Sequence, residues 1–551
     1  MFKSNASKEY FEDCFELPNS GLRAYFNRVV KGNPEIYDTP FAKGESTDHL
    51  IGEWKEHLQS LAKKWPSLVD FENDLANKVG PMSVMKPLSE RMKDIDSYYE
   101  GILLPSEPIN HSAVAAVVSE WSRLRGLEVR RQNETVKLMK KSTNSGAPYF
   151  TKRRNVVDKT YACNAYSYQG ETIVWQGLPK FKYFHEAIPT NWKFWYNRTC
   201  AILGWRGQEG GLDPDDVKQR VVFMFPFAVN VCELQVYQPL IEAAQRFNLV
   251  PAWVSMESVD EAITLMFDTK ADGDLVVCTD FSKFDQHFNK DLQSAAREVL
   301  TSVLSPSACA VKSSWWIEDI FPIKYNIPLA YDWGKVRFGD HGMGSGSGGT
   351  NCDETIAHRA LQYEAAQNAG VKLNPHSQCL GDDGILTYPG ITVDDVVESY
   401  TRHGLEMNVA KQYASTQDCI YLRRWHHKDY RVNGKCVGVY STCRALGRLR
   451  YLERFQDPSF WDSKAVALRQ LSILENVKYH PLKEEFVEYC MKRDKYRLGI
   501  DIPHFLDDIE SIAREKIEHM PDFLGYTKTL QSSGDETGGI ANWWIVKYLK
   551  S

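Results

Sequence analysis

The sequence lacks the features that mark several large classes of protein. None of its 12 cysteines stands in a C-x-x-C pair or near a histidine at zinc-finger spacing, which argues against a structural zinc site and fits a reducing compartment. No segment approaches the ~18 uninterrupted apolar residues of a membrane span, because the best candidate, residues 221–231, is about half that length and contains Pro226. The first residues show neither the apolar core of a signal peptide nor a glycine for myristoylation. We therefore expect neither a membrane anchor nor secretion.

The composition is that of a folded protein, and the chain is long enough to be a large enzyme. The chain has 551 residues, of which 43% are hydrophobic, 25% charged and 12% aromatic, so a disordered or collagen-like chain is excluded. Its length is roughly three to four times that of a typical single domain, which predicts several subdomains around more than one core.

The net charge of −6 is small but unevenly distributed. Residues 121–154 carry ten basic side chains against two acidic ones, and residues 423–454 hold a second basic stretch. An acidic exterior with basic internal grooves would suit a polyanion such as a nucleic acid. Two solvated helix faces would give the same pattern, so the charge distribution alone leaves both interpretations open.

The pattern of apolar residues predicts a mixed α+β fold. The first ~110 residues are expected to form helices and loops, including a helix from Leu50 to Leu61 capped by Asp48. The central part predicts strands at 275–280, 379–380, 385–388, 405–409 and 419–422, and helices at 292–304, 350–369 and 393–403. The order β-α-β-β-α-β is that of a ferredoxin-like antiparallel sheet.

Three aspartates stand where this sheet would bring them together. Asp280 ends one predicted strand, and Asp382 and Asp383 occupy the turn of a predicted hairpin whose strands would be its neighbours. Carboxylates packed this closely repel one another unless a divalent cation offsets them, and oxygen ligands without nearby His or Cys favour Mg²⁺ or Mn²⁺. Two such ions would support phosphoryl transfer. The alternative is that Gly-Asp-Asp-Gly is simply a favourable tight turn.

The surrounding residues resemble the motifs of viral RNA-dependent RNA polymerases. Residues 280–285 (Asp-Phe-Ser-Lys-Phe-Asp), 345–351 (Ser-Gly-Ser-Gly-Gly-Thr-Asn) and 381–383 (Gly-Asp-Asp) are similar to motifs A, B and C, in their usual order. Flanking segments look like motifs G (143–148), F (218–221), D (404–411) and E (421–424). The motif sequences and chain length look most like those of small double-stranded RNA viruses, picobirnaviruses first and partitiviruses second.

The resemblance implies roles for the acidic residues. Asp280 and Asp382 would hold two Mg²⁺ or Mn²⁺ ions, and Asp383 would be a weaker or indirect ligand. Asp285 would accept a hydrogen bond from the ribose 2′-hydroxyl, the group that distinguishes RNA from DNA. The alternative for Asp285 is an ordinary surface carboxylate.

The glycine-rich loop is implied to position nucleotide and template. Ser345, Gly346 and Thr350 would line it, with glycines allowing close backbone approach. Many family members place Asn four residues after this Thr, where the chain has Glu354. Asn351 is the other candidate for that ribose contact, and the sequence leaves the choice open.

Basic residues are implied to bind phosphates. Lys218 and Arg220 alternate on a predicted strand and would share one face, where they could neutralise the triphosphate. Lys411 would be the general acid that protonates pyrophosphate. A solvated strand edge and a lone surface lysine are the competing interpretations.

Template contacts are expected from two further segments. The motif G segment would contribute Ser145, Gly146 and Pro148, and the residues near motif E would contribute Arg423 and Arg424.

The resemblance implies a right-hand polymerase with fingers, palm and thumb, the palm built on the ferredoxin-like sheet. The expected parts are an N-terminal extension bridging fingers and thumb (1–110), fingers (111–270), palm with motif A (271–307), a fingers insert (308–345), palm with motifs B, C, D and the start of E (346–424), and thumb with the C-terminal tail (425–551).

The implied activity is template-directed transfer of a nucleotidyl group from an NTP to an RNA 3′-hydroxyl, with release of pyrophosphate, in viral genome replication and transcription. Expected partners are RNA template and product and NTPs, with capsid protein as a further candidate. We expect a monomer that acts in the virion interior and the host cytoplasm.

Two alternatives compete with this interpretation. A reverse transcriptase also carries paired aspartates in a hairpin, but usually has a bulky residue where Asp285 stands. A non-catalytic RNA-binding or capsid protein would use the basic stretches alone, and its carboxylates would weaken RNA binding.

Overall fold

A four-stranded antiparallel sheet carries the three aspartates. The computed structural model describes residues 8–160, 163–168, 171–176, 196–305, 310–517, 519–520 and 539–551. Within them, β6 (Val276–Thr279) pairs with β10 (Asp383–Leu386) and β11 (Tyr413–Ser415), and β10 also pairs with β9 (Gln378–Leu380). The predicted hairpin around the Gly-Asp-Asp-Gly turn is therefore confirmed.

Successive residues of β6 face opposite sides of this sheet, and both sides are covered. Val277 packs with helices α12 (Lys290–Val303), α14 (Thr350–Asn368) and α15 (Val393–Thr401), which the sequence predicted within a few residues. Val276 and Cys278 pack on the other face with α11 (Met256–Thr269) and β12 (Asp418–Tyr421). The sheet is thus fixed from both sides, and its edge positions the aspartates.

One predicted strand and one predicted helix cap are wrong. Residues 405–409 form no strand; Glu406 makes a single bridge to Ser282, and the fourth strand is β11 instead. Helix α3 (Thr47–Leu58) is capped by Ser46, whose hydroxyl accepts the His49 N–H, so Asp48 lies inside the first turn.

A second sheet has the order β5-β4-β7-β8, and a third has the order β1-β2-β3. The second sheet contains the long hairpin of β4 and β5, which projects Lys218 and Arg220. The strands are β1 (Cys163–Tyr168), β2 (Glu171–Gln176), β3 (Tyr196–Thr199), β4 (Ala201–Gln208), β5 (Lys218–Met224), β7 (Leu329–Asp332) and β8 (Lys335–Arg337). The surrounding helices are α5 (Leu88–Glu100), α6 (His111–Glu120), α7 (Gln132–Leu138), α8 (Val157–Thr160), α9 (Phe227–Arg246), α10 (Pro251–Val254) and α13 (Ala310–Trp315).

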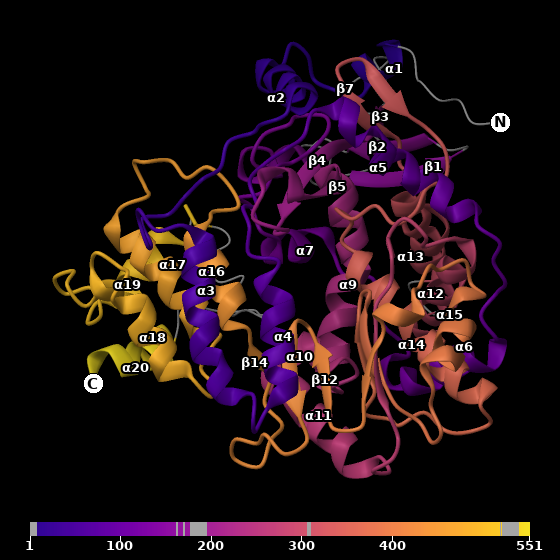
Figure 1. Cartoon of the computed structure of the whole chain (residues 1–551). Helices are drawn as coiled ribbons and strands as arrows, with labels where there is room; N and C mark the ends of the chain where they lie inside the picture. The colour runs from indigo at the N-terminus through magenta and orange to yellow at the C-terminus, as the bar shows by residue number, and fades with distance from the viewer. Residues whose placement is uncertain are drawn as a thin grey trace.

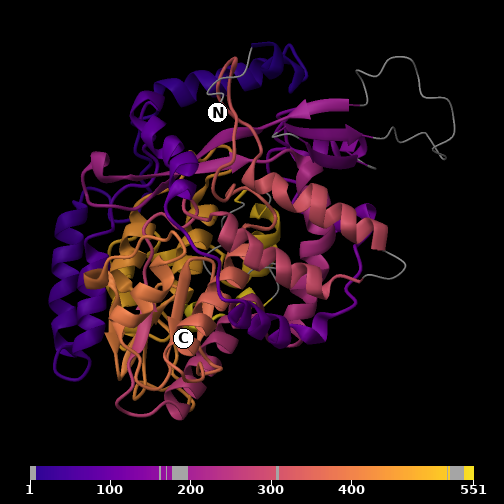
Figure 2. The same cartoon turned by 90° about the vertical axis from the view of Figure 1, so that its right-hand side faces the viewer.

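The N-terminal residues contact both ends of the molecule (Figure 1). Helices α1 (Lys8–Asp13) and α2 (Ser20–Lys31) pack on β3, β7 and β8, whereas α3 and α4 (Pro66–Ala76) pack on α16 (Thr442–Arg450). Trp54 of α3 donates its indole N–H to Thr442 at 2.7 Å. Figure 2 shows the two indigo helix groups on separate parts of the fold, with residues of the same N-terminal segment between them.

The C-terminal part is mainly helical, around an apolar core that it shares with α3 and α4. Strands β12, β13 (Arg424–His427) and β14 (Val439–Tyr440) precede α16, α17 (Ser463–Glu475), α18 (Lys483–Met491), α19 (Ile509–Lys516) and α20 (Trp544–Lys550). Ile545, Val546 and Leu549 of α20 are buried in this core. Among the helices that the structure describes, none is both long enough and apolar enough to span a bilayer.

Candidate active site

Asp280 and the pair Asp382–Asp383 meet at one edge of the central sheet. Thr279 of β6 pairs with Gly384 of β10 in antiparallel register, so the residues just beyond that pair leave the sheet at the same place. About a hundred residues of chain separate these positions, and the predicted convergence is confirmed.

Three side chains bind the backbone at this edge of the sheet, and the sequence analysis did not identify them. Gln412 forms two hydrogen bonds with the backbone of Asp280, accepting its N–H at 2.7 Å and donating to its carbonyl at 2.8 Å. On α14, Thr355 accepts the N–H of Gly381 at 2.9 Å and the His358 ring contacts the Gly381 carbonyl at 2.9 Å. Thr355 and His358 are one turn apart on the helix that follows motif B, so they face the same way, and this spacing is the sequence feature that could have predicted their contacts.

Gly384 belongs to the same arrangement. A Cβ at this position would lie 2.6 Å from the His358 ring, closer than non-bonded atoms approach. The glycine after the two aspartates therefore allows α14 to pack directly behind the turn.

All three aspartates have raised pKa values, which indicates that the nearby cations do not fully offset their negative charge. Loss of hydration raises the pKa of Asp280, although Lys411, Lys78 and Lys218 oppose the shift. Loss of hydration and the neighbouring Asp285 raise the pKa of Asp382, and burial together with Asp382 raises the pKa of Asp383 to about 7. Asp280 and Asp382 remain open to solvent, so a cation can reach them.

Asp383 is oriented differently from the other two. One of its oxygens accepts the Leu422 N–H at 2.8 Å. Among the described acidic and histidine side chains, three ligand atoms lie within 4.8 Å of one another only in the exposed group Glu45, His49 and Glu53. The aspartates are therefore spread more widely than three ligands of one ion.

The glycine-rich loop lies against the β5 strand. Ser345 donates to the Val221 carbonyl at 3.2 Å, and the Thr350 hydroxyl donates to the Gly344 carbonyl at 3.1 Å. A Cβ on Gly346 would lie only 1.7 Å from the Phe223 carbonyl oxygen. The hydrogen bonds of Ser345 and Thr350 therefore fix the conformation of the loop. Gly346 lets the loop approach β5 closely because it has no side chain.

Glu354, and not Asn351, is the residue of α14 that approaches Asp285. Glu354 is 4% exposed and hydrogen bonds with Asp285; burial raises its pKa well above the ordinary range, and Asp285 raises it further. Its Oε1 atom has no hydrogen-bond partner among the described residues. Asn351 uses its carbonyl oxygen to accept the Trp253 indole N–H at 2.8 Å.

The basic residues that were predicted to bind the triphosphate lie near Asp280 and Asp382. Lys218 and Arg220 are both exposed on β5, as the alternation predicted. Lys218 is close enough to Asp280 to oppose the rise in its pKa, and Arg220 opposes the rise in the pKa of Asp382. Lys411 is exposed and contributes the largest of the opposing charges at Asp280.

The three residues of motif G that were predicted to contact the template lie in a loop that is packed against the rest of the protein. Ser145 is 1% exposed and its hydroxyl accepts the Thr151 N–H, so its burial does not support the predicted template contact. Gly146 has a left-handed φ of 62°, and a Cβ there would lie 2.6 Å from the Phe225 carbonyl. Pro148 is half-buried and accepts the Glu16 N–H at 3.0 Å through its carbonyl.

Arg423 and Arg424 have different environments. Arg424 points into the protein, where it donates to Asp260 at 3.3 Å and to the Gly438 carbonyl at 2.9 Å. This internal pairing does not support the RNA contact predicted for Arg424, because the charge already has a partner inside the fold. Arg423 has a side chain that is 42% exposed and lies next to the residue that hydrogen bonds to Asp383.

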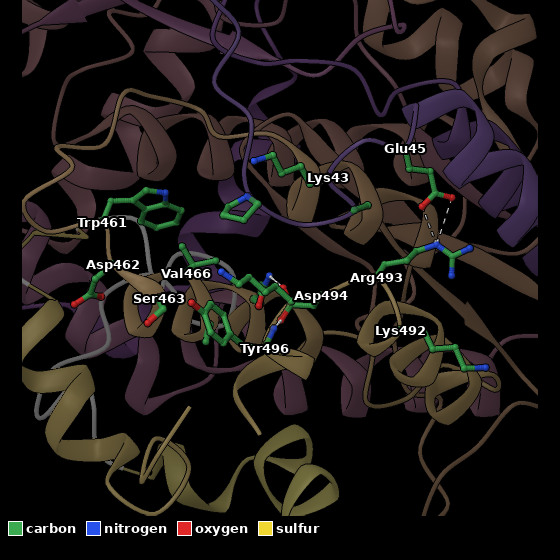
Figure 3. A pocket seen from close by; sticks show the side chains of 15 residues that line it. Lys43, Glu45, Trp461, Asp462, Ser463, Val466, Lys492, Arg493, Asp494 and Tyr496 are labelled. Atoms are coloured by element: carbon green, nitrogen blue, oxygen red, sulfur yellow. Dashed lines mark hydrogen bonds and ion pairs between the residues drawn. The ribbon is translucent and has the colours of Figure 1, made fainter. Parts of the chain in front are cut away.

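A cavity of about 720 Å³ lies elsewhere, between residues 40–45 and the helical C-terminal part (Figure 3). Arg493 forms an ion pair with Glu45 at its wall, at 3.1 Å. None of the predicted site residues lines it. The cavity is therefore separate from the candidate active site.

This fold and this arrangement of aspartates define a polymerase, and sequence comparison agrees. Residues 81–437, more than half of the chain, match the profile of the family described as viral RNA-dependent RNA polymerase. The chain belongs to this family.

Three of the proteins that it matches come from human picobirnaviruses. A potential RNA-dependent RNA polymerase of human picobirnavirus (strain Human/Thailand/Hy005102/-) is 59% identical over 541 residues, 98% of each chain. A crystal structure of a human picobirnavirus RNA-dependent RNA polymerase is 57% identical with a TM-score of 0.91. The structure of an insertion-loop deletion mutant of such a polymerase is 55% identical with a TM-score of 0.90, and each covers 99% of both chains.

Proposed function

We propose that the chain copies an RNA template by transferring a nucleotidyl group from an NTP to an RNA 3′-hydroxyl, with release of pyrophosphate. The observation that carries this proposal is the convergence of Asp280 and Asp382 at one sheet edge, beside the glycine-rich loop and the two cations of β5. Membership of the polymerase family supports the same reaction.

Asp280 and Asp382 are the proposed ligands of two divalent ions, Mg²⁺ or Mn²⁺. Oxygen donors with raised pKa values and access to solvent fit such hard cations. When bound, the ions supply activation of the attacking hydroxyl and stabilisation of the leaving oxyanion. Asp383, with one oxygen committed to Leu422, serves as a weaker or indirect ligand.

Sugar selection is proposed to depend on Asp285. Its carboxylate accepts the ribose 2′-hydroxyl while Glu354, whose pKa is raised by burial and by Asp285, donates a hydrogen bond to Asp285 from behind. A site built around this acceptor leaves it unpaired when a dNTP binds, which disfavours DNA synthesis.

The remaining charged residues are proposed to handle phosphates and protons. Lys218 and Arg220 neutralise the triphosphate from the exposed face of β5, and Lys411 donates a proton to the leaving pyrophosphate. Ser345, Gly346, Thr350 and Asn351 shape the wall that the nucleotide faces. Gly146 and Pro148 guide the template through backbone placement.

The proposed architecture is a right hand with fingers, palm and thumb. The central sheet with α12, α14 and α15 would be the palm, the sheets around the β4–β5 hairpin would belong to the fingers, and the helices from α16 onward would form the thumb. Contacts of α1–α2 and of α3–α4 with opposite ends support the N-terminal extension as a bridge. We extend the proposal to a monomer that acts in the virion interior and host cytoplasm, with capsid protein as partner.

A primer-extension assay on a defined RNA template tests this proposal. We expect extension with NTPs and Mg²⁺, little extension with dNTPs, and none after chelation of the metal. Equal use of dNTPs would favour a reverse transcriptase, and RNA binding without extension would favour a non-catalytic protein.

A further inference from the structure

One buried carboxylate, Glu209, joins three parts of the molecule beside the active site. It directly follows β4, is 7% exposed, and accepts hydrogen bonds from Arg423 at 3.1 Å and from Arg444 at 3.2 Å. Arg448 lies 3.4 Å away. Arg423 lies in the turn between β12 and β13, and the other two arginines are one turn apart on α16. The tip of the β4–β5 hairpin is thus tied to the turn and to α16 through a single side chain.

The cluster carries more positive charge than Glu209 can offset. Burial alone would raise the pKa of Glu209, but Arg448, Arg444 and Arg423 outweigh it and lower the pKa to about 2. Arg448 also pairs with Glu453, which leaves the excess on Arg423 and Arg444. Among the residues that the structure describes, Arg423 has no hydrogen-bond partner other than Glu209.

Arg423 occupies a position that it would not hold unaided. Leu422 and Arg423 both have left-handed backbones, with φ of 52° and 57°, a conformation that costs non-glycine residues energy. Arg220 and the arginines of α16 repel the Arg423 guanidinium, and Arg423 in turn repels Lys218. The attraction of Glu209 opposes this repulsion and keeps Arg423 beside Lys218 and Arg220.

We propose that Glu209 is a positioning residue for the incoming nucleotide: it holds Arg423 so that the guanidinium, with Lys218 and Arg220, binds the polyphosphate. A planar guanidinium pairs with phosphate oxygens in two parallel hydrogen bonds, which suits a triphosphate or the released pyrophosphate. This inference rests on the proposed polymerase function. It assigns Arg423 to binding of the nucleotide, whereas the sequence predicted that Arg423 contacts the template.

The test is single-nucleotide incorporation by the full-length Glu209→Gln variant on a preformed RNA primer–template. We expect the KM for NTP to rise about fivefold to tenfold, with kcat within about twofold and RNA affinity unchanged. Arg423→Ala should raise KM by a similar factor, and the double variant should do little more, because both changes remove the same interaction. Inhibition by pyrophosphate should weaken in parallel if product and substrate share the subsite; inhibition that stays unchanged would restrict the subsite to the triphosphate.

Glu453→Gln is the matched control. It removes a half-buried carboxylate from Arg448, one of the three arginines, without touching Arg423, so we expect its melting temperature to fall while the KM for NTP stays unchanged. Equal KM effects in the two variants would overturn the proposal, as would weaker RNA binding by Glu209→Gln at an unchanged KM. If Glu209→Gln does not fold, an unchanged KM in Arg423→Ala overturns it instead. Failure of the wild type to incorporate NTPs would refute the polymerase function itself.

Discussion

Asp285 is the residue that is proposed to contact the ribose 2′-hydroxyl. Asp285→Ala should lower the ratio of kcat/KM for NTP to that for dNTP by about tenfold or more, because the acceptor for the 2′-hydroxyl is lost. Steady-state incorporation of matched NTP and dNTP pairs measures this ratio. An unchanged ratio would show that Asp285 does not contact the ribose.

Substitutions of Glu354, which hydrogen bonds with Asp285, test the same site. Glu354→Gln keeps an N–H donor of the same shape toward Asp285, and we expect it to preserve most of the NTP preference. Glu354→Ala leaves Asp285 without that hydrogen bond and should lose the preference. If both variants discriminate like the wild type, Glu354 has only a packing role, which a lowered melting temperature alone would reveal.

Individual residues differ in how far sequence reveals them. Asp280, Asp382 and the cations of β5 could be predicted because their motifs combine short-range spacing with strand alternation. The environment of Arg424 could not, since its partner Asp260 lies more than a hundred positions away. That of Ser145 could not either, since its carbonyl accepts the N–H of Phe227, which is also distant in the chain. Glu354 was noticed as a departure from the family pattern, but only the fold placed it next to Asp285.

At the scale of elements, the last helix depends on a cap from another helix. Glu475 of α17 accepts the N–H groups of Trp544 and Ile545 at 3.2 and 3.0 Å, where α20 begins. Glu475→Ala should therefore cost about 1–2 kcal/mol of stability, the usual loss when a helix cap is removed. Thermal unfolding followed by circular dichroism measures the change.

Glu488→Ala provides the comparison for that prediction. Glu488 also contacts α20, through the Tyr548 hydroxyl at 3.0 Å, but the contact is exposed. We expect a change within about 0.5 kcal/mol. If both variants unfold at the same temperature, Glu475 does not cap α20.

The elements themselves were largely predictable, and the errors have a common cause. Strands β9 and β10 and helices α12, α14 and α15 follow strong local patterns. The strand expected at 405–409 fails because the edge of the sheet is instead filled by β11, whose neighbour Gln412 binds the Asp280 backbone. Apolar alternation does not specify which of two short segments reaches a sheet edge.

At the scale of the whole molecule, the N-terminal residues link parts that lie far apart. Residues 78–86 run from α16 to the β4–β5 hairpin: Val79 packs on Gly447, the Gly80 N–H donates to Gly210, and Gln219 donates to the Val84 carbonyl. No local pattern in the first ~110 residues signals this path, because it is fixed by contacts with residues more than a hundred positions away.

Asp280 and Asp382 are proposed to form the catalytic centre of an RNA polymerase. The most direct measurement is primer extension with NTPs and Mg²⁺ by the wild type, by Asp382→Ala and by Asp394→Ala, which changes an exposed acid on α15. We predict normal extension by Asp394→Ala, and loss of synthesis by Asp382→Ala with folding and RNA binding retained. Extension by Asp382→Ala above about a tenth of the wild-type rate, a barrier change below ~1.4 kcal/mol, would contradict the account.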